Sequence, residues 1–472
     1  MKEEYNNLFN ENDFDELIDR YEKMLKSGQS YYFDVEDLEY ILDYYVDTDQ
    51  EGKALRAVKY GLRLHPEALS LVVKKAHILL KNKSPKKALT ALDQIGSMDL
   101  LNNEIHMARG HANVMLGNSE QAKKEYNKAL KMASDQDETI EIMQNIAHSF
   151  EMVENYKEAL HYLFRAYKLD ETNLFVVQEL AYCYEKNAQL ESALQYYHKC
   201  IDIDPFSEGV WVSIGRTYKE TGDVEKAINA FEYVKAINPE SLDACQELAI
   251  SHQEVKDFKT AIEYYREYQK IVGEQEESPE IVLSIGYCYT ALNKNKKALE
   301  CYNKALELDN YNPEIYHEIS NIYFEQKNYW DALFYAKKAT IVDDETDYFF
   351  TSYGQIASQL KLKNEAIIAF EKAVELNPKT YNNWVLLIDE LIKNGYTHRT
   401  IATLEEAIDN NFGNAEIYFR LAAFLYKERE YIKAFKYFRK GMSDDPQEKS
   451  IFFEICPGAK KSKEINKILK AG

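Results

Sequence analysis

Three histidines recur at nearly regular spacing in the first third of the chain. His77, His111 and His148 are separated by 34 and 37 residues. Neutral imidazole is a common ligand of zinc and other transition metals, so three histidines suggest a metal site. Imidazoles beside amide and phenol groups also bind a peptide backbone through hydrogen bonds. Which chemistry applies depends on how far apart the chain holds the three rings.

Other reactive side chains do not complete a catalytic motif. Gly52-Lys53 lacks the upstream glycine of a phosphate-binding loop. His317-Glu318 begins like the helix of a zinc protease, but Asn321 stands where the second metal ligand is required. No GxSxG nucleophile turn occurs in the sequence. We therefore predict no catalytic residues, no metal site, no cofactor and no enzymatic activity.

The histidine spacing belongs to a repeat that runs along the chain. Alanines recur every 34 residues, with two steps of 37, and eleven of twelve equivalent positions are Ala. Twelve residues before each alanine lies another small residue, which is Gly, Ala or Ser in ten repeats, as at Gly215 and Gly286. Self-similarity with this period indicates an array of repeated supersecondary units.

The spacing of large residues within one period predicts two helices. Apolar residues at i, i+3, i+4 and i+7 give each helix one buried stripe. Small residues let the two helices approach closely, and rings such as Phe231 and Tyr302 fill the space beside the contact. Proline ends several second helices at one position, as at Pro205 and Pro239. Such a hairpin must stack on neighbours to bury its faces.

This pattern closely resembles the tetratricopeptide repeat family. The best match is the run Trp211, Ile214, Gly215, Tyr218, Ala227, Phe231 and Pro239. The resemblance covers twelve repeats in residues 35–448, which begin at Val35, Leu69, Asn103, Ile140, Leu174, Glu208, Leu242, Pro279, Pro313, Asp347, Tyr381 and Ala415. It implies an all-α fold, a right-handed superhelical solenoid of helical hairpins, with a concave groove lined by the first helices.

The segments outside the repeats are interpreted as caps. Residues 1–34 are predicted to form an N-terminal capping helical hairpin and residues 449–472 C-terminal capping helices, because a solenoid must cover its apolar ends. Extra residues near 134–138 and near 273–279 predict second helices that are longer by most of a turn. For the later insertion, an acidic run between Gly and Pro also favours a hinge near 273–279.

First-helix positions that the resemblance assigns to the groove supply the candidate binding residues. Equivalent positions on adjacent repeats are two helix layers apart, at about 8–10 Å per layer, which far exceeds a ~2 Å metal-ligand shell. The histidines are therefore interpreted as part of a polar groove floor that binds an extended peptide, or alternatively as solvated side chains. The predicted peptide-binding residues are His77, His111, Gln144, His148, Gln178, Tyr182, Arg216 and Gln246.

Charge is distributed unevenly along a chain whose net charge is −21. Residues 1–50 carry a net −11, whereas residues 51–132 carry +8. The overall balance argues against nucleic-acid binding. The basic second and third repeats either form a solvated face or attract an acidic partner in a salt-sensitive way. The predicted basic patch comprises Lys74, Lys75, Lys81, Lys83, Lys86 and Lys87.

The cysteines and the absence of an apolar leader segment indicate in which cellular compartment the protein is expected. Six cysteines without a CxxC pair indicate reduced thiols, and no window approaches 18 uncharged apolar residues. We expect a cytoplasmic protein without membrane association that is a monomer or self-associates weakly.

The predicted function is a non-catalytic protein–protein interaction scaffold that binds an unidentified protein or extended peptide in its concave groove. The alternative is a peptide-sensing regulatory protein whose superhelix changes pitch on ligand binding. A change in the radius of gyration on binding would favour this sensor over a preformed scaffold.

Overall fold

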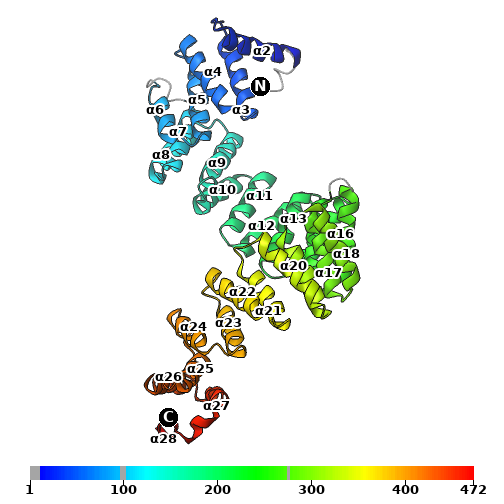
Figure 1. Cartoon of the computed structure of the whole chain (residues 1–472). Helices are drawn as coiled ribbons and strands as arrows, with labels where there is room; N and C mark the ends of the chain where they lie inside the picture. Colours follow the sequence, from blue (N-terminus) through cyan, green and yellow to red (C-terminus); the bar gives the residue numbers. More distant parts are fainter. Residues whose placement is uncertain (1–10, 96–101, 274–276, 472) are drawn as a thin grey trace. The chain divides into compact units, whose positions relative to one another are not determined.

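The computed structural model describes residues 11–95, 102–273 and 277–471. Throughout this part of the chain the structure is all-helical, and the helices pair as hairpins in chain order (Figure 1). The predicted all-α fold built from helical hairpins is therefore confirmed. The chain divides into two compact units, of which the first ends at Ala244 and the second begins at Cys245.

In the first unit, helix α2 (Glu11–Ser27) precedes a series of hairpins. Their first helices are α3 (Val35–Asp47), α5 (Leu69–Lys81), α7 (Asn103–Met115), α9 (Gln136–Glu151), α11 (Leu174–Lys186) and α13 (Glu208–Glu220). Their second helices are α4 (Glu51–Leu64), α6 (Pro85–Leu92), α8 (Ser119–Leu130), α10 (Tyr156–Leu169), α12 (Leu190–Ile203) and α14 (Val224–Ile237).

In the second unit the same alternation continues. The first helices are α15 (Leu242–Glu254, which begins before the unit boundary), α17 (Pro279–Ala291), α19 (Pro313–Glu325), α21 (Asp347–Gln359), α23 (Tyr381–Lys393) and α25 (Ala415–Lys427). The second helices are α16 (Phe258–Val272), α18 (Asn295–Leu308), α20 (Tyr329–Val342), α22 (Lys363–Leu376), α24 (Thr397–Asp409) and α26 (Tyr431–Asp444). The chain then forms η3 (Pro446–Lys449), α27 (Ser450–Ile455), η4 (Pro457–Lys461) and α28 (Lys463–Ala471).

The first helices begin at the predicted repeat starts, with one exception. Helix α9 begins at Gln136 instead of Ile140, and it has 16 residues, whereas the preceding second helix α8 has 12. The prediction that the extra residues near 134–138 lengthen a second helix is therefore wrong. The reason is a cap: the Asp135 carboxylate accepts a hydrogen bond from the Glu138 amide at 2.8 Å, and the Glu138 carboxylate accepts one from the Ser134 amide at 2.6 Å.

Each hairpin reverses direction at one equivalent position with a left-handed backbone. These positions are Asp49, Lys83, Gly117, Glu154, Ala188, Gly222, Lys256, Asn293, Lys327, Lys361, Gly395 and Arg429, with φ between 50° and 81°. In the first hairpin the Gln50 amide donates to the Tyr45 carbonyl at 2.7 Å, and the Asp49 amide donates to the Val46 carbonyl at 3.3 Å. These two bonds satisfy carbonyls at the end of α3 and fix the direction in which α4 leaves.

The two helices of a hairpin pack through a small residue that faces an aromatic ring. A Cβ added at Gly215 would lie 2.4 Å from Cε1 of Phe231, and one added at Gly286 would lie 2.3 Å from Cε1 of Tyr302. Both rings are fully buried. Because the ring occupies the place of the missing side chain, the first helix turns this side toward its partner helix in every such repeat.

The ends of the array carry their own apolar clusters. Ile18, Tyr21 and Met24 of α2 pack with Phe33 against α3 and α4. At the other end, Phe452, Ile465 and Ile468 belong to one buried cluster with Phe438 of α26. The first ten residues of the predicted N-terminal hairpin lie outside the described residues. So do residues 274–276 of the predicted hinge near 273–279, and the hinge stays a prediction.

Replacing Gly215 by Ala should destabilise the protein by about 1–3 kcal/mol, because the new methyl group overlaps the Phe231 ring. Gly209 lies on the same helix, and a Cβ there meets no atom within 4 Å. Gly209→Ala should therefore raise stability by about 0.4–1 kcal/mol. The measurement is the midpoint of urea unfolding of both variants. Shifts of the same sign would contradict the hairpin contact.

Candidate functional site

The first helices of neighbouring hairpins form a common face in the first unit. Helix α3 contacts α5, α5 contacts α7, and α7 contacts α9 directly, while the second helices α4, α6, α8, α10 and α12 pack on the first helix of the next hairpin. One side of every first helix is thus left without a helical partner. We call the surface formed by Asp43, His77, His111, His148 and Tyr182 and their immediate neighbours on these helices the first-helix face.

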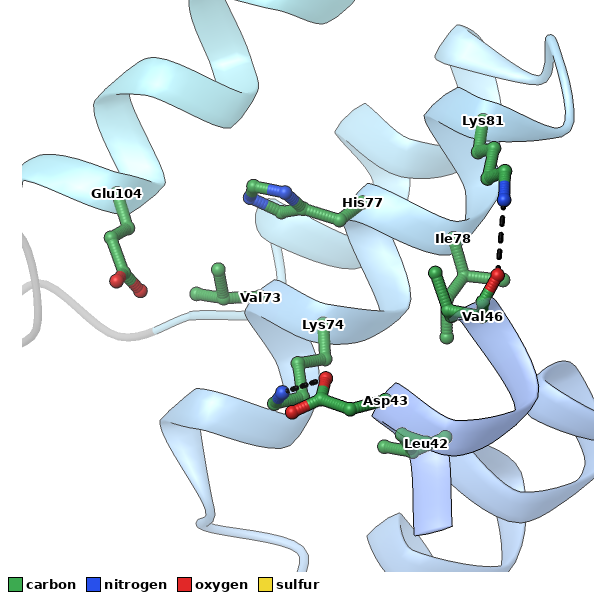
Figure 2. Close-up of a pocket in the computed structure, with 9 residues that line it drawn as sticks. All are labelled: Leu42, Asp43, Val46, Val73, Lys74, His77, Ile78, Lys81 and Glu104. Carbon is green, nitrogen blue, oxygen red and sulfur yellow. Dashed lines mark hydrogen bonds and ion pairs between the residues drawn. The ribbon is translucent and has the colours of Figure 1, made fainter. Parts of the chain in front are cut away.

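A cavity of about 470 Å³ lies on this face between α3, α5 and α7 (Figure 2). Its lining combines an apolar floor with a polar rim. The floor consists of Leu42, Val46, Val73 and Ile78, and the rim consists of Asp43, Lys74, His77, Lys81 and Glu104. The cavity therefore offers an apolar surface for a side chain and hydrogen-bonding groups at its edge.

Two lysines of the rim are held by partners on α3 and in the turn that follows it. Lys74 forms an ion pair with Asp43. The Lys81 ammonium donates to the Asp49 carboxylate at 2.7 Å and to the Val46 carbonyl at 3.1 Å. Figure 2 shows both side chains reaching from α5 to α3. These contacts fix the rim and neutralise part of its positive charge.

His77 and His111 are present as neutral imidazoles at neutral pH. Burial lowers the pKa of His77 below its ordinary value. Burial, together with repulsion of positive charge by the neighbouring His77 and His148, lowers the pKa of His111 to about 4. The Nε2 atom of His111 is buried and has no hydrogen-bond partner. A neutral imidazole both donates and accepts, so these rings offer hydrogen bonds and not charge.

A pair of carboxyl groups lies beside these histidines and was not predicted from the sequence. Burial, together with the nearby Glu151 on α9, raises the pKa of Glu179 on α11 to about 7. Glu151 accepts a hydrogen bond from the Cys183 thiol at 3.1 Å and lies 3.6 Å from Nδ1 of His148. The available signal was an acidic residue next to Gln178, but sequence alone does not bring it beside Glu151.

The remaining predicted groove residues occupy separate places. Gln144 on α9 is half-buried, and Gln178 on α11 is exposed. Tyr182 is exposed, with the Lys186 ammonium 5.4 Å from its ring centroid. The Arg216 guanidinium on α13 lies 3.7 Å from the Asp243 carboxylate. The eighth residue of the set, Gln246, is exposed on α15 and belongs to the second unit.

The six lysines of the predicted basic patch are distributed over both helices of one hairpin. Lys74 and Lys81 line the cavity on α5, and Lys75 is half-buried on the same helix. Lys83 lies in the turn, whereas Lys86 and Lys87 are exposed on the second helix α6. Attraction of an acidic partner to this region stays a prediction.

Among residues 11–95, 102–273 and 277–471, no group of three or more His, Cys, Asp or Glu side chains is arranged to hold a metal ion. Over the same described ranges, no helix combines the length and the apolar character needed to span a bilayer.

Comparisons with known proteins identify the repeats. A family model described as a TPR repeat matches residues 286–327. A second model, described as the tetratricopeptide repeat, matches residues 104–136, 176–207, 209–241 and 349–380. No curated protein shows significant similarity to the chain.

Several solved structures resemble the chain at low identity. One is the APC/C hetero-tetramer Cut9-Hcn1, with 15% identity, 82% of this chain and 90% of that chain covered, and a TM-score of 0.36. Another is the MamA protein, with 22% identity, 36% and 92% covered, and a TM-score of 0.34. A third is a tetratricopeptide repeat protein from Parabacteroides merdae, with 16% identity, 53% and 98% covered, and a TM-score of 0.41. At these values the likenesses carry no argument about function.

The low pKa of His111 predicts acid sensitivity that His111→Gln should reduce. The folded-state pKa of about 4 lies below the ordinary 6.5, so between these values the unfolded chain binds the proton more readily. The contribution of the neutral His111 imidazole to stability is thus fully present near pH 7 and is lost as the pH falls toward 4. Urea unfolding at pH 7 and pH 4.5 should show a smaller loss in the variant, by about 1–3 kcal/mol. Equal losses would contradict this prediction.

Glu179 predicts the opposite pH dependence. The folded-state pKa of Glu179, about 7, lies above the ordinary 4.5. The contribution of the protonated carboxyl to folding stability is therefore lost as the pH rises from 4.5 through 7. Glu179→Gln mimics the protonated form. Compared with the wild type, the variant should gain about 1–3 kcal/mol at pH 8 and little at pH 4.5 in urea unfolding. A gain that is the same at both pH values would show that Glu179 is not the titrating group.

Proposed function

Because the chain is a tetratricopeptide repeat protein, we propose that it is a non-catalytic protein–protein interaction scaffold whose first-helix face binds an extended segment of a partner. Domains of this family generally bind proteins. The observation that carries the proposal is the cavity between α3, α5 and α7, which joins an apolar floor to a polar rim on that face.

The cavity suits one apolar side chain of an extended segment. In an extended chain successive side chains point to opposite sides, so one can enter the floor while its neighbours remain at the surface. Burying a Leu or Val side chain against Val73 and Ile78 would contribute about 1.5–3 kcal/mol. The apolar floor therefore supplies binding energy at one anchor position.

The rim suits the backbone of the same segment. The neutral His77 imidazole can donate to a peptide carbonyl, and the Glu104 carboxylate can accept from a peptide N–H group. Beyond the cavity, the unpartnered Nε2 of His111 offers a further hydrogen-bonding position on α7. Since contacts with α3 already hold Lys74 and Lys81, little side-chain entropy is lost when a segment binds there.

The test is affinity capture from a native lysate with a first-helix variant and a matched control. The variant replaces four residues of the first-helix face by Ala: His77, His111, Gln144 and His148. The control replaces four exposed residues of second helices by Ala: Lys87, Asn127, Lys157 and His161. The wild type and the control should capture the same partner, and the variant should lose it. Circular dichroism and the unfolding midpoint check that both proteins fold.

Cross-linking locates the contact independently of the substitutions. Amine-reactive cross-linking followed by mass spectrometry should join the captured partner to Lys74 or Lys81, at the rim of the cavity. Capture that is equal for the variant and the control, with cross-links confined to Lys86, Lys87 or other second-helix lysines, would show that the partner binds elsewhere.

A further inference from the structure

Three consecutive first helices of the second unit contain neither Lys nor Arg. Helices α17, α19 and α21 have 13 residues each and carry no Lys or Arg. At the chain's average of 58 Lys and Arg in 472 residues, about five would be expected over this length. Their acidic residues are Glu280, Glu314, Glu318, Glu325 and Asp347.

The basic residues of the same hairpins lie on the second helices. Helices α18, α20 and α22 carry Lys296, Lys297, Lys304, Lys337, Lys338, Lys363 and Lys372. The local composition therefore does not lack lysine. Instead, positive charge is absent from the first helices only, so those helices present a negative field to any partner that docks along them.

Two carboxylates and two phenol rings come together on these helices. Burial, together with Glu314, Asp343 and Glu318, raises the pKa of Tyr348 on α21 to about 12. Burial also raises the pKa of Tyr287 on α17, with Glu318, Glu314 and Tyr348 as additional causes. Glu314 and Glu318 lie one helical turn apart on α19, and the ring of His317 beside them lies 5.2 Å from the ring of Tyr348 on α21. Tyr287 on α17 is close enough to both carboxylates to be affected by them, so we group Tyr287, Glu314, Glu318 and Tyr348 as one cluster.

The carboxylates of this cluster have no cationic partner. Burial raises the pKa of Glu318, and Glu314 and Glu325 raise it further. The amide nitrogen of Asn321 approaches the Glu318 carboxylate at 3.5 Å. Within the described residues, neither Glu314 nor Glu318 forms an ion pair with Lys or Arg. A partly buried carboxylate without a counter-charge is unfavourable, and a cation supplied by a ligand would relieve it.

The other titratable groups named beside the cluster, Asp343, Glu325 and His317, add no positive charge. The His317 ring lies in edge contact with Tyr348, with 5.2 Å between ring centroids. Burial lowers the pKa of His317, so the imidazole is neutral at neutral pH. Its Nδ1 atom is buried and lacks a hydrogen-bond partner. Carboxylates, phenol rings and a neutral imidazole therefore make up the polar part of this face.

We propose that the face formed by α17, α19 and α21 binds an extended, arginine-rich segment of a partner protein, with Glu314 and Glu318 pairing with its guanidinium groups and Tyr287 and Tyr348 packing against them. A guanidinium forms two-pronged hydrogen bonds with carboxylates and stacks on aromatic rings, which lysine does less well. The proposal deepens the proposed function, on which it rests, by naming the chemistry of one bound segment.

The experiment measures how tightly the full-length protein binds a fluorescent peptide. In this peptide four arginines alternate with serines. Companion peptides replace every Arg by Lys or by Gln. The test variant is Glu314→Gln with Glu318→Gln. The matched control is Glu300→Gln with Glu307→Gln, which changes the net charge equally at two exposed positions of the second helix α18. Fluorescence anisotropy is recorded at low and high salt.

The wild type should bind the Arg peptide at least about tenfold more tightly than the Gln peptide, and more tightly than the Lys peptide. The test variant should lose about tenfold in affinity, while the control should stay within about twofold of the wild type. Tyr287→Leu with Tyr348→Leu should reduce the preference for Arg over Lys. Circular dichroism checks the fold of each variant.

Equal losses in the test variant and the control would overturn the proposal, because they would reflect net charge alone. Salt-sensitive self-association that disappears in the test variant would also overturn it, since the occupant would then be a second copy of the chain. The peptide assay reports on residues of the second unit only. Its failure would leave partner capture through His77 and His111 intact, whereas loss of that capture would leave the peptide result unchanged.

Discussion

The contact between a small residue on one helix and an aromatic ring on the next determines the rest of this structure. At Gly215 and Gly286 the ring occupies the space that a Cβ would need. This contact orients each first helix toward its own second helix. The second helix in turn packs on the following hairpin. Within the described part of each unit, one side of the first helices thus faces away from the second helices, and repetition of the same contact aligns these sides in neighbouring repeats.

The free side places equivalent residues of adjacent repeats close enough to influence each other. His111 is affected by His77 and His148, which are 34 and 37 residues away in the sequence. Glu179 is affected in the same way by Glu151. Each of these groups is also partly withdrawn from solvent, so its charged form is disfavoured. The array thus creates a chemical environment that no single repeat possesses.

The two compact units present different chemistry on their first helices. In the first unit, lysines fixed by carboxylates of α3 and of the turn after it surround an apolar floor. In the second unit, helices α17, α19 and α21 lack basic residues and combine carboxylates with phenol rings. A scaffold with these two faces is suited to partner segments of different composition, because charge complementarity selects partners more strongly than contact area does.

The sequence by itself determined the helical hairpins and almost every first-helix start, because small residues, rings and prolines act within one period of the chain. It also placed His77 and His111 at equivalent positions of two successive first helices, which are α5 and α7. The start of α9 was missed because the cap at Asp135 is a local hydrogen-bond pattern independent of the period. Only the tertiary structure decided that Lys74 is paired, that Glu179 lies beside Glu151, and that a cavity opens between α3, α5 and α7. These features depend on side chains that meet across repeats, where the distance and burial that set their charge are not encoded in the spacing of residues along the chain.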